Sequence, residues 1–569
     1  MANLNLKDKD NRTFDAIVVG TGVSGGWAAK ELCEGGLKTL VLDRGKDVKH
    51  IEDYHTANLD PWDMELKGSL TREEMAAIPK QSRSGSPKRK ETAHYYVNDI
   101  EHPYHEDKPF DWIRGYHVGG RSIMWGRQSY RLSDLDFAAN ITDGHGVDWP
   151  IRYKDIAPWY DYVERHAGIS GNRDGLMQLP DGEFMPPFEL NCVELSVKEK
   201  IEQTFPERNL IIGRTANITE AKDHRGKCMA RARCNRGCPF GAAFSSQSAT
   251  LPYAEQTGNM VLRPNAIVSK VLYDADSGKA TGVLAIDKES KEEIEYYAKI
   301  IFVNASAVAS TAILLHSKSD RFPDGMGNDS GELGHNLMDH AMGAGAGGTV
   351  EGFEDKYFFG RRPTGFYIPR LRNLSKSTKR TDYLRGFGYQ GGAGRSNWKR
   401  GEKSFEFGAS FKDSMFKPGP WSIGMGGFGE CLPYHENRMY LNEEVKDQWG
   451  QPTVTFDAQF RENEQAMCKD IGESAGEMLE AAGVKNVGIR CNITNIGLGI
   501  HEMGTARMGK NPKTSVLNVH NQIHAVPNVF VTDGACMTSA ACQNPSLTYM
   551  ALTARAANFA LNQLKNNNI

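Results

Sequence analysis

Two short segments near the C-terminus hold side chains that could carry out one reaction together. His501 opens the run His-Glu-Met-Gly-Thr-Ala-Arg-Met-Gly, and Asn544 follows later in Gln-Asn-Pro-Ser. An imidazole takes up a proton near neutral pH, whereas a carboxamide can hold and orient a hydroxyl without accepting its proton. Taken alone, such residues are more often structural, as a core or surface histidine and as a turn asparagine before proline. Their chemistry therefore depends on what the rest of the chain supplies.

Three clustered cysteines form a second candidate site, with the spacing C-x5-C-x3-C followed by proline: Cys228, Cys234 and Cys238. Thiolates are the usual ligands of iron–sulfur clusters, and three of them without a fourth nearby fit a [3Fe-4S] cluster. Two alternatives remain open, because His224 could complete a Cys3His zinc site or the thiols could be structural. Interleaved arginines would favour thiolate and offset the charge of a cluster. These are Arg231, Arg233 and Arg236.

A glycine-rich turn near the N-terminus predicts a dinucleotide-binding βαβ unit. Phe14–Val19 is typical of a buried strand, residues 27–34 favour a helix, and residues 38–42 favour a second strand that ends at Asp43. In such a unit the three glycines make the turn, admit the pyrophosphate and let helix pack on strand, while the acid accepts ribose hydroxyls. The glycines are Gly20, Gly22 and Gly25. The unit alone does not distinguish FAD from NAD.

A second glycine-rich segment precedes residue 127 and contains Gly119, Gly120, Ser122 and Gly126. Adjacent glycines beside serine and tryptophan let the backbone approach a flat, polar ring system closely. An ordinary tight turn is the alternative interpretation.

The remaining chain alternates between helical, strand-like and irregular segments. Residues 46–109 form a polar excursion, and residues 171–215 are irregular and contain several prolines. Between residues 345 and 457, strand-like fragments such as 422–432 and 453–456 predict an antiparallel sheet that covers a substrate. Helices are expected over 156–168, 310–317, 463–482 and 548–566, and strands over 260–273, 278–287, 300–305 and 529–532.

Length and charge exclude some classes of protein. A chain of 569 residues is too long for one hydrophobic core, and a net charge of −3 does not favour nucleic acid as a partner. Met1–Arg12 lacks the apolar region of a secretory signal. We find no run of about 18 apolar residues, so no membrane-spanning helix is expected.

These pieces, in this order, resemble the glucose-methanol-choline (GMC) family of FAD-dependent oxidoreductases from Phe14 to about Asn562. The similarity is greatest to a bacterial branch with the large subunits of FAD glucose, gluconate and fructose dehydrogenases and glucoside 3-dehydrogenases. Segments typical of that branch are Trp149–Tyr153, Asn336–His340 and Gly429–Arg438. The resemblance implies an α/β fold, α+β overall, in which a Rossmann-type FAD-binding domain joins an antiparallel-sheet substrate-binding domain.

The same resemblance divides the chain. It implies that the FAD-binding domain comprises residues 1–55, 110–150, 216–344 and 490–569. Residues 151–215 and 345–489 would form the substrate-binding domain, and residues 56–109 remain the excursion.

By matching to the family, His501 and Asn544 would face the flavin, with Asp533 and its neighbour Gly534 at the ribityl chain. The first glycine-rich turn and Asp43 would contact the adenosine diphosphate, and the second glycine-rich segment would line the isoalloxazine. Some relatives attach FAD through a histidine two residues after the serine of that segment. Met124 stands there, so the sequence predicts non-covalent FAD. The remaining histidines singled out, His117, His335 and His340, are expected to be structural.

The combined prediction is an FAD-dependent sugar dehydrogenase that oxidises a hydroxyl of a pyranose or glycoside, with a preference for a glucoside 3-dehydrogenase. Electrons would leave through the [3Fe-4S] cluster to a cytochrome c or another acceptor. A small subunit would carry the export signal, which implies the periplasm, with the cytoplasm as the alternative. Other interpretations are a gluconate 2- or glucose 1-dehydrogenase subunit, an O2-dependent oxidase and a noncatalytic flavoprotein.

Overall fold

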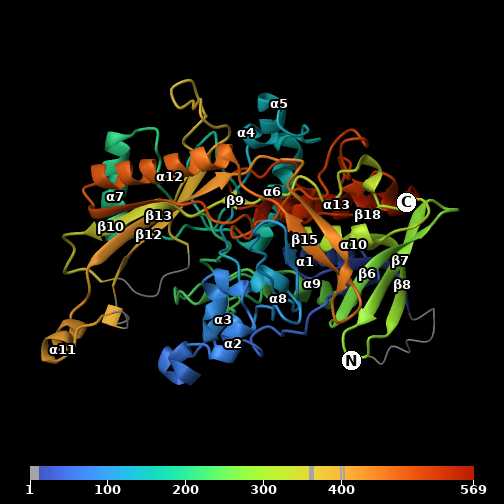
Figure 1. Ribbon diagram of the computed structural model, residues 1–569, viewed down its shortest axis with the longest axis horizontal. Helices are drawn as coiled ribbons and strands as arrows, with labels where there is room; N and C mark the ends of the chain where they lie inside the picture. Colours follow the sequence, from blue (N-terminus) through green and yellow to red (C-terminus); the bar gives the residue numbers. More distant parts are fainter. Residues whose placement is uncertain (1–11, 358–363, 397–399, 402–403) are drawn as a thin grey trace.

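The computed structural model describes residues 12–357, 364–396, 400–401 and 404–569, and within these ranges the strands form three sheets (Figure 1). The two larger sheets lie toward opposite ends of the molecule. The expectation about a missing export signal rests on residues that are largely outside the described ranges, so it stays a prediction.

Four parallel strand pairings form the centre of the first sheet, and the N-terminal strand takes part in two of them. Its residues Ala16, Ile17 and Val18 are fully buried, as is typical of a parallel strand that is covered on both faces. Its strand order is β17-β18-β8-β1-β2-β5, and an antiparallel pair extends it from β8. The strands are β1 Thr13–Val19, β2 Thr39–Leu42, β5 Met260–Arg263, β6 Ala266–Asp274, β7 Lys279–Asp287, β8 Glu293–Val303, β17 Gln522–Ile523 and β18 Val526–Phe530.

Helices cover this sheet and fix the ends of its strands. The glycine-rich turn leads from β1 directly into α1, which packs against the C-terminal helix α13 and against α9. Helix α10 follows β8 at the same sheet edge and contacts β6. The helices near this sheet are α1 Val23–Glu34, α6 Tyr153–Ala167, α8 Ser246–Ala249, α9 Leu251–Gln256, α10 Ala307–His316 and α13 Ser546–Lys565.

The second sheet is antiparallel throughout its described pairings and has the order β16-β10-β13-β12-β11-β4, with β9 beside β13. The amphipathic helix α12 lies across it, with α7 alongside (Figure 1). The elements are β4 Ile211–Ile212, β9 His340–Ala341, β10 Ala344–Val350, β11 Phe366–Ile368, β12 Phe387–Arg395, β13 Trp421–Glu430, β16 Lys485–Cys491, α7 Cys192–Thr204 and α12 Glu462–Ala481.

A small third sheet joins the excursion to the rest of the molecule. Strand β15 pairs with β14 and, in parallel, with β3 from the excursion. The excursion is therefore more than a surface loop. These strands are β3 His105–Glu106, β14 Arg438–Lys446 and β15 Pro452–Asp457, and the remaining α-helices are α2 Arg72–Ala76, α3 Lys90–Ala93, α4 Asp134–Phe137, α5 Ala139–Asp143 and α11 Ala409–Phe416.

The mixed architecture that the resemblance implied, a parallel sheet plus an antiparallel one, is confirmed. Two local expectations were wrong. The supposedly irregular stretch 171–215 contains α7, which starts with a capping box between Asn191 and Glu194 that the sequence already displayed. The expected strand 260–273 is split into β5 and β6, because Pro264 lacks an N–H and Asn265 takes a left-handed φ of 56°.

None of the described helices is both long enough and apolar enough to cross a membrane.

Candidate active site

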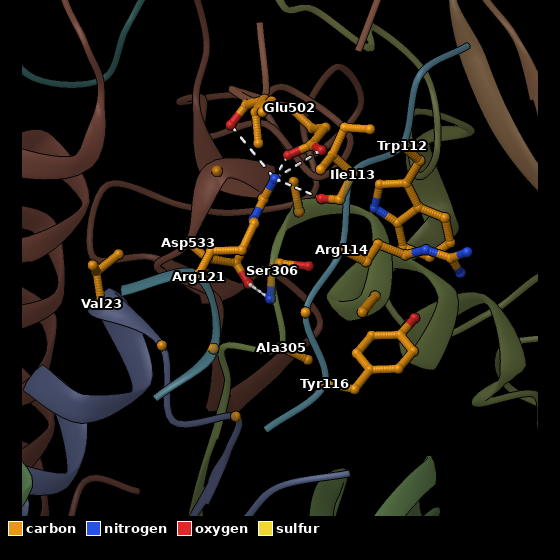
Figure 2. A pocket seen from close by; sticks show the side chains of 18 of the residues that line it. Val23, Trp112, Ile113, Arg114, Tyr116, Arg121, Ala305, Ser306, Glu502 and Asp533 are labelled. Carbon is orange, nitrogen blue, oxygen red and sulfur yellow. Dashed lines mark hydrogen bonds and ion pairs between the residues drawn. The ribbon is translucent and has the colours of Figure 1, made fainter. Parts of the chain in front are cut away.

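One large cavity, of about 700 Å³, brings together most of the residues that the sequence singled out. Its walls come from the glycine-rich turn, the excursion, the second glycine-rich segment, β12 and the C-terminal loops. Figure 2 shows Arg121 reaching toward Glu502, with Trp112, Arg114 and Tyr116 along the wall opposite Val23. A cavity of this size is suited to a large organic cofactor and a substrate.

The N-terminus of α1 can hold a phosphate group. Its first turn has no side-chain cap and no acidic residue, so backbone N–H groups remain for an anion. A side chain at Gly22 would meet no atom within 4 Å, which leaves space for close approach, whereas at Gly25 it would lie 2.0 Å from the Gly20 oxygen. A pyrophosphate site requires both kinds of glycine, because one lets the phosphate approach the backbone and the other lets the helix pack on the strand.

Asp43 lies at the end of β2, as predicted, and ties three segments together. Its carboxylate accepts hydrogen bonds from the Thr21 hydroxyl and, at 2.8 Å, from the Gly45 N–H. Thr21 in turn accepts from the Gly119 N–H at 2.7 Å. Burial raises the pKa of Asp43 to about 6. The residue lines the cavity where the ribose is expected.

The second glycine-rich segment is only partly in the predicted position. Gly120, Ser122 and Gly126 line the cavity, but Gly119 does not. A side chain at Gly119 would lie 2.1 Å from the Gln247 amide, so packing beneath the turn requires that glycine. The Ser122 hydroxyl accepts from the Ser246 N–H at 2.9 Å, which fixes the turn from the protein side.

Asp533 and Gly534 follow β18 and also line the cavity. The Asp533 carboxylate accepts from the Ser310 hydroxyl at 2.5 Å and from the backbone N–H groups of Ser306 and Ala535, both at 3.0 Å. Burial raises the pKa of Asp533 to about 6. Through these hydrogen bonds, Asp533 joins the end of β18 to the start of α10.

The structure brings His501 and Asn544 together at the cavity wall. The His501 Nε2 and the Asn544 Nδ2 lie 3.4 Å apart, and Gln390 of β12 donates from its Nε2 to the Asn544 Oδ1. That contact orients the carboxamide so that its NH2 group faces His501. Gln390 was not predicted, because the sequence does not reveal which β12 residues face the cavity.

His340, which was expected to be structural, lies directly against His501. Its Nδ1 lies 2.8 Å from the His501 Nδ1, and its Nε2 lies 2.9 Å from the Ala541 carbonyl oxygen. His340 is fully buried and His501 is partly exposed at the cavity wall, and desolvation lowers the pKa of His340 to about 4 and that of His501 well below 6.5. The segment Asn336–His340 was noticed in the sequence as typical of one branch, but nothing in it indicated this contact.

The loop that carries His501 is held by a buried carboxylate. Asp339 accepts backbone hydrogen bonds from Gly497 and Gly499, both at 2.8 Å, and from His501 at 3.1 Å. Glu502 forms a bidentate ion pair with Arg121 on the cavity side, with N–O distances of 3.0 and 2.6 Å. The imidazole is therefore fixed in place from both its main chain and its ring.

The three cysteines meet at a separate, small cavity of about 20 Å³. Cys234 is buried and accepts from the Asn217 Nδ2 at 3.6 Å. His224 bonds instead to the Ser248 carbonyl oxygen at 2.9 Å and does not line this cavity, which disfavours a Cys3His zinc site. Among the described residues, no group of three or more His, Cys, Asp or Glu side chains is arranged so that it could hold a metal ion, and this includes the three cysteines.

The arginines beside the cysteines hold their loop to the excursion, and their effect on the thiolates stays a prediction. Arg231, Arg233 and Arg236 donate to the backbone carbonyls of residues 57–59 in the excursion. The cation that favours a thiolate at Cys234 belongs to the fully buried Arg127, although burial still raises the pKa of that thiol to about 11. Arg127 also lines the large cavity, so it lies between the two sites.

Comparison with curated proteins finds distant relatives of nearly full length. 2-Methyl-1,2-propanediol dehydrogenase of Mycolicibacterium austroafricanum is 27% identical over 96% of this chain and 94% of its own length. The fructose dehydrogenase large subunit of Gluconobacter japonicus is 26% identical over 97% of this chain and 98% of its own.

Among solved structures, pyridoxine 4-oxidase from Mesorbium loti superposes with a TM-score of 0.58 at 16% identity, over 96% of this chain and 98% of that one. This likeness supports the fold alone. The N-terminal signature of GMC oxidoreductases matches residues 14–342 and the C-terminal signature residues 433–553. FAD follows from this match, and the chain belongs to the GMC oxidoreductases, which act on alcohol or sugar hydroxyls.

Proposed function

We propose that this protein is a sugar dehydrogenase that oxidises a ring hydroxyl of a pyranose or glycoside to a ketone. The observation that carries the proposal is the pair formed by the His501 Nε2 and the Asn544 Nδ2, 3.4 Å apart on the wall of the large cavity. One group can take a proton and the other can hold the same oxygen, which is what alcohol oxidation requires.

Each side chain has a separate task. His501 accepts the hydroxyl proton at Nε2, since burial keeps its imidazole neutral. Asn544 donates an N–H to the substrate oxygen and directs the hydrogen on the adjacent carbon. Bound FAD would supply the acceptor for that hydrogen as hydride. The GxGxxG turn, the N-terminus of α1 and Asp43 would hold the adenosine diphosphate, and Met124 on the wall supports non-covalent attachment.

The walls around this pair support a sugar as substrate. Trp125 and Phe428 offer apolar faces, and Gln390 and Gln128 offer amide groups. Sugar rings need both, because their C–H faces are apolar and their hydroxyls require hydrogen bonds. The fructose dehydrogenase relative agrees with this class. We favour the 3-hydroxyl of a glycoside, by the similarity of residues 501–509 to that subgroup.

The cysteine site supports a dehydrogenase with an external electron acceptor. Cys228, Cys234 and Cys238 line one cavity, and Arg127, which lines the large cavity, interacts electrostatically with Cys234 and Cys238. A [3Fe-4S] cluster held by these thiolates would pass single electrons to a cytochrome c. A large-subunit relative supports a small partner subunit, and we propose that this partner brings the protein to the periplasm.

Anaerobic mixing of the FAD-loaded protein with a panel of sugars, glycosides and diols tests the substrate class. We expect flavin bleaching with one group of pyranosides and a 3-keto product by NMR. A 2-keto gluconate or a glucono-lactone would instead identify the gluconate or glucose type. Bleaching by no sugar but by a diol would overturn the proposal, and bleaching by nothing would favour a noncatalytic flavoprotein.

Oxygen separates a dehydrogenase from an oxidase. We expect little peroxide when the reduced protein meets air, and rapid reduction of a one-electron dye. Iron analysis of protein prepared without oxygen should give about three atoms per chain, as a [3Fe-4S] cluster requires. Fast peroxide formation without iron would instead establish an oxidase with structural thiols.

A further inference from the structure

A second histidine lies directly behind the first, on the side away from the cavity. His340 belongs to β9, is fully buried, and meets the His501 ring edge to face, with ring centroids 4.9 Å apart. The two rings approach through like atoms, because each presents its Nδ1 to the other at 2.8 Å. Two neutral imidazoles can share only one proton at such a contact.

The backbone decides which ring carries that proton. The Ala541 carbonyl oxygen lies 2.9 Å from the His340 Nε2 and can only accept, so the His340 Nε2 carries a hydrogen. Burial keeps His340 neutral, with a pKa of about 4, and its Nδ1 therefore holds a lone pair. The shared proton must then belong to the His501 Nδ1. The opposite arrangement would set a lone pair against the carbonyl and leave it unpaired.

The same direction continues into the cavity. Once the His501 Nδ1 is protonated, its Nε2 holds the lone pair, which faces the Asn544 Nδ2 at 3.4 Å. Gln390 donates to the Asn544 Oδ1, which turns the NH2 of that amide toward His501. These hydrogen bonds form one row, from Gln390 through Asn544, His501 and His340 to the Ala541 carbonyl oxygen. Each N–H in this row points toward that oxygen. The nitrogen proposed as the base therefore holds its lone pair on the cavity side of the ring.

We propose that His340 is a positioning residue that fixes the tautomer of His501, so that Nε2 is always the nitrogen able to take the substrate proton. The inference rests on the proposed function of His501 as the base. When the substrate O–H bond breaks, a new N–H bond forms at Nε2 and the ring becomes an imidazolium. The His340 Nδ1 lone pair then stabilises that charge through the Nδ1–H it already accepts.

The backbone around this row is built to keep it in place. Ala541, which supplies the terminal carbonyl, has a left-handed φ of 57°, and Ile500, which precedes the base, has a φ of 58°. Non-glycine residues, and β-branched ones above all, adopt this region at a cost that the surrounding contacts must offset. Asp339, next to His340, provides part of that compensation through its bond to the His501 N–H at 3.1 Å.

The direct test is ¹⁵N NMR of the FAD-loaded protein labelled at its histidines. We expect the His501 Nδ1 to show a pyrrole-type signal and its Nε2 a pyridine-type signal, with the reverse pattern at His340. The variants His501→Gln and His340→Gln assign the signals by their loss. A pyrrole-type Nε2 at His501 in the wild-type protein would overturn the proposal, whatever the variants do.

The kinetic test compares His340→Leu with His340→Gln. Leucine fills the space without an acceptor, and glutamine restores both a donor for the Ala541 carbonyl and an acceptor for the His501 Nδ1–H. We expect flavin reduction to slow about 10²-fold in the leucine variant, with the substrate Kd within about twofold, and to recover to within about tenfold in the glutamine variant. His335→Leu is the matched control, since His335 stacks on His435 outside the site.

Failure of this inference is distinguishable from failure of the proposed function. If His501→Ala reduces flavin normally, the proposed base is wrong. If His501→Ala is slow but His340→Leu keeps the wild-type rate and the His501 Nδ1 signal, then His340 does not set the tautomer. Should the leucine variant lose FAD, the glutamine variant and the wild-type spectrum still decide.

Discussion

The loop that carries His501 and the loop that carries the cysteines are built in different ways. In the first, Asp339 binds three backbone N–H groups and His340 holds the reactive ring itself. In the second, arginines anchor the loop to the excursion from outside, and N–H groups donate to the thiols, at 3.4 Å from Ala230 to Cys228 and 3.6 Å from Asn217 to Cys234.

Both loops nevertheless contain non-glycine residues with left-handed backbone. Ile500 has a φ of 58° beside His501, and Ala230 and Ala232 have φ values of 50° and 54° between the cysteines. Such conformations cost roughly 1–3 kcal/mol each and persist only where other interactions offset them. In the first loop the contacts of Asp339 and His340 provide this stabilisation. In the second the arginine contacts to the excursion provide it.

The largest expected effect comes from removing the base. In His501→Ala, flavin reduction by substrate should slow about 10²–10⁴-fold, because the hydroxyl proton has no acceptor at the right position. FAD content should remain that of the wild type, since the Asp43 and α1 contacts are unchanged. Stopped-flow absorbance under argon measures both. A decrease of less than tenfold in the rate of flavin reduction would show that the loop carrying His501 does not supply the base.

A smaller loss of activity is expected when the backbone hydrogen bonds that Asp339 accepts from the His501 loop are weakened. In Asp339→Asn the amide cannot accept from all of the Gly497, Gly499 and His501 N–H groups, so at least one buried donor is unsatisfied. This should lower the free energy of unfolding by about 1–3 kcal/mol, seen in urea titrations. Flavin reduction should slow by up to about 10²-fold. Unchanged stability would mean that the loop is held by packing instead.

The pH dependence should be modest above pH 6.5. Burial, together with His340 and Arg121, lowers the pKa of His501 well below 6.5. A base with a lowered pKa stays unprotonated to lower pH, so activity is lost only as the pH falls through that value. Flavin reduction should therefore change less than about twofold between pH 8 and 6.5. An acid limb centred at or above pH 6.5 would contradict a buried, neutral base.

The smallest effect on flavin reduction is expected from a change in the loop that carries the cysteines. Cys234→Ala should leave the rate of flavin reduction by substrate within about twofold of wild type, because none of Cys228, Cys234 and Cys238 lines the cavity that holds His501. The same variant should lose bound iron and the transfer of electrons to a cytochrome. Parallel flavin, iron and cytochrome assays on one preparation separate these outcomes. Slowed flavin reduction with iron retained would show that the loops are not independent.

The sequence predicted those parts of the site that follow from local rules. The glycine turn, Asp43 and the strand before Asp533 depend on βαβ geometry, and each lies where it was expected. Gln390 and His340 depend on how β12 and β9 meet loops more than a hundred residues away. Periodicity within one segment carries no information about such contacts. The same reason explains why Arg127, outside the cysteine motif, was missed as the cation beside Cys234.

The place of β18 in the first sheet has a consequence for biosynthesis. This strand pairs with β8, and helix α13, which follows it, covers the buried Ala28, Ala29 and Leu32 of α1. Both elements are synthesised long after α1 and β8, so a nascent chain that lacks them exposes an apolar helix and an unpaired strand edge. We therefore expect chaperones to hold the nascent chain until β18 and α13 have been made, and cofactor loading to begin only afterwards.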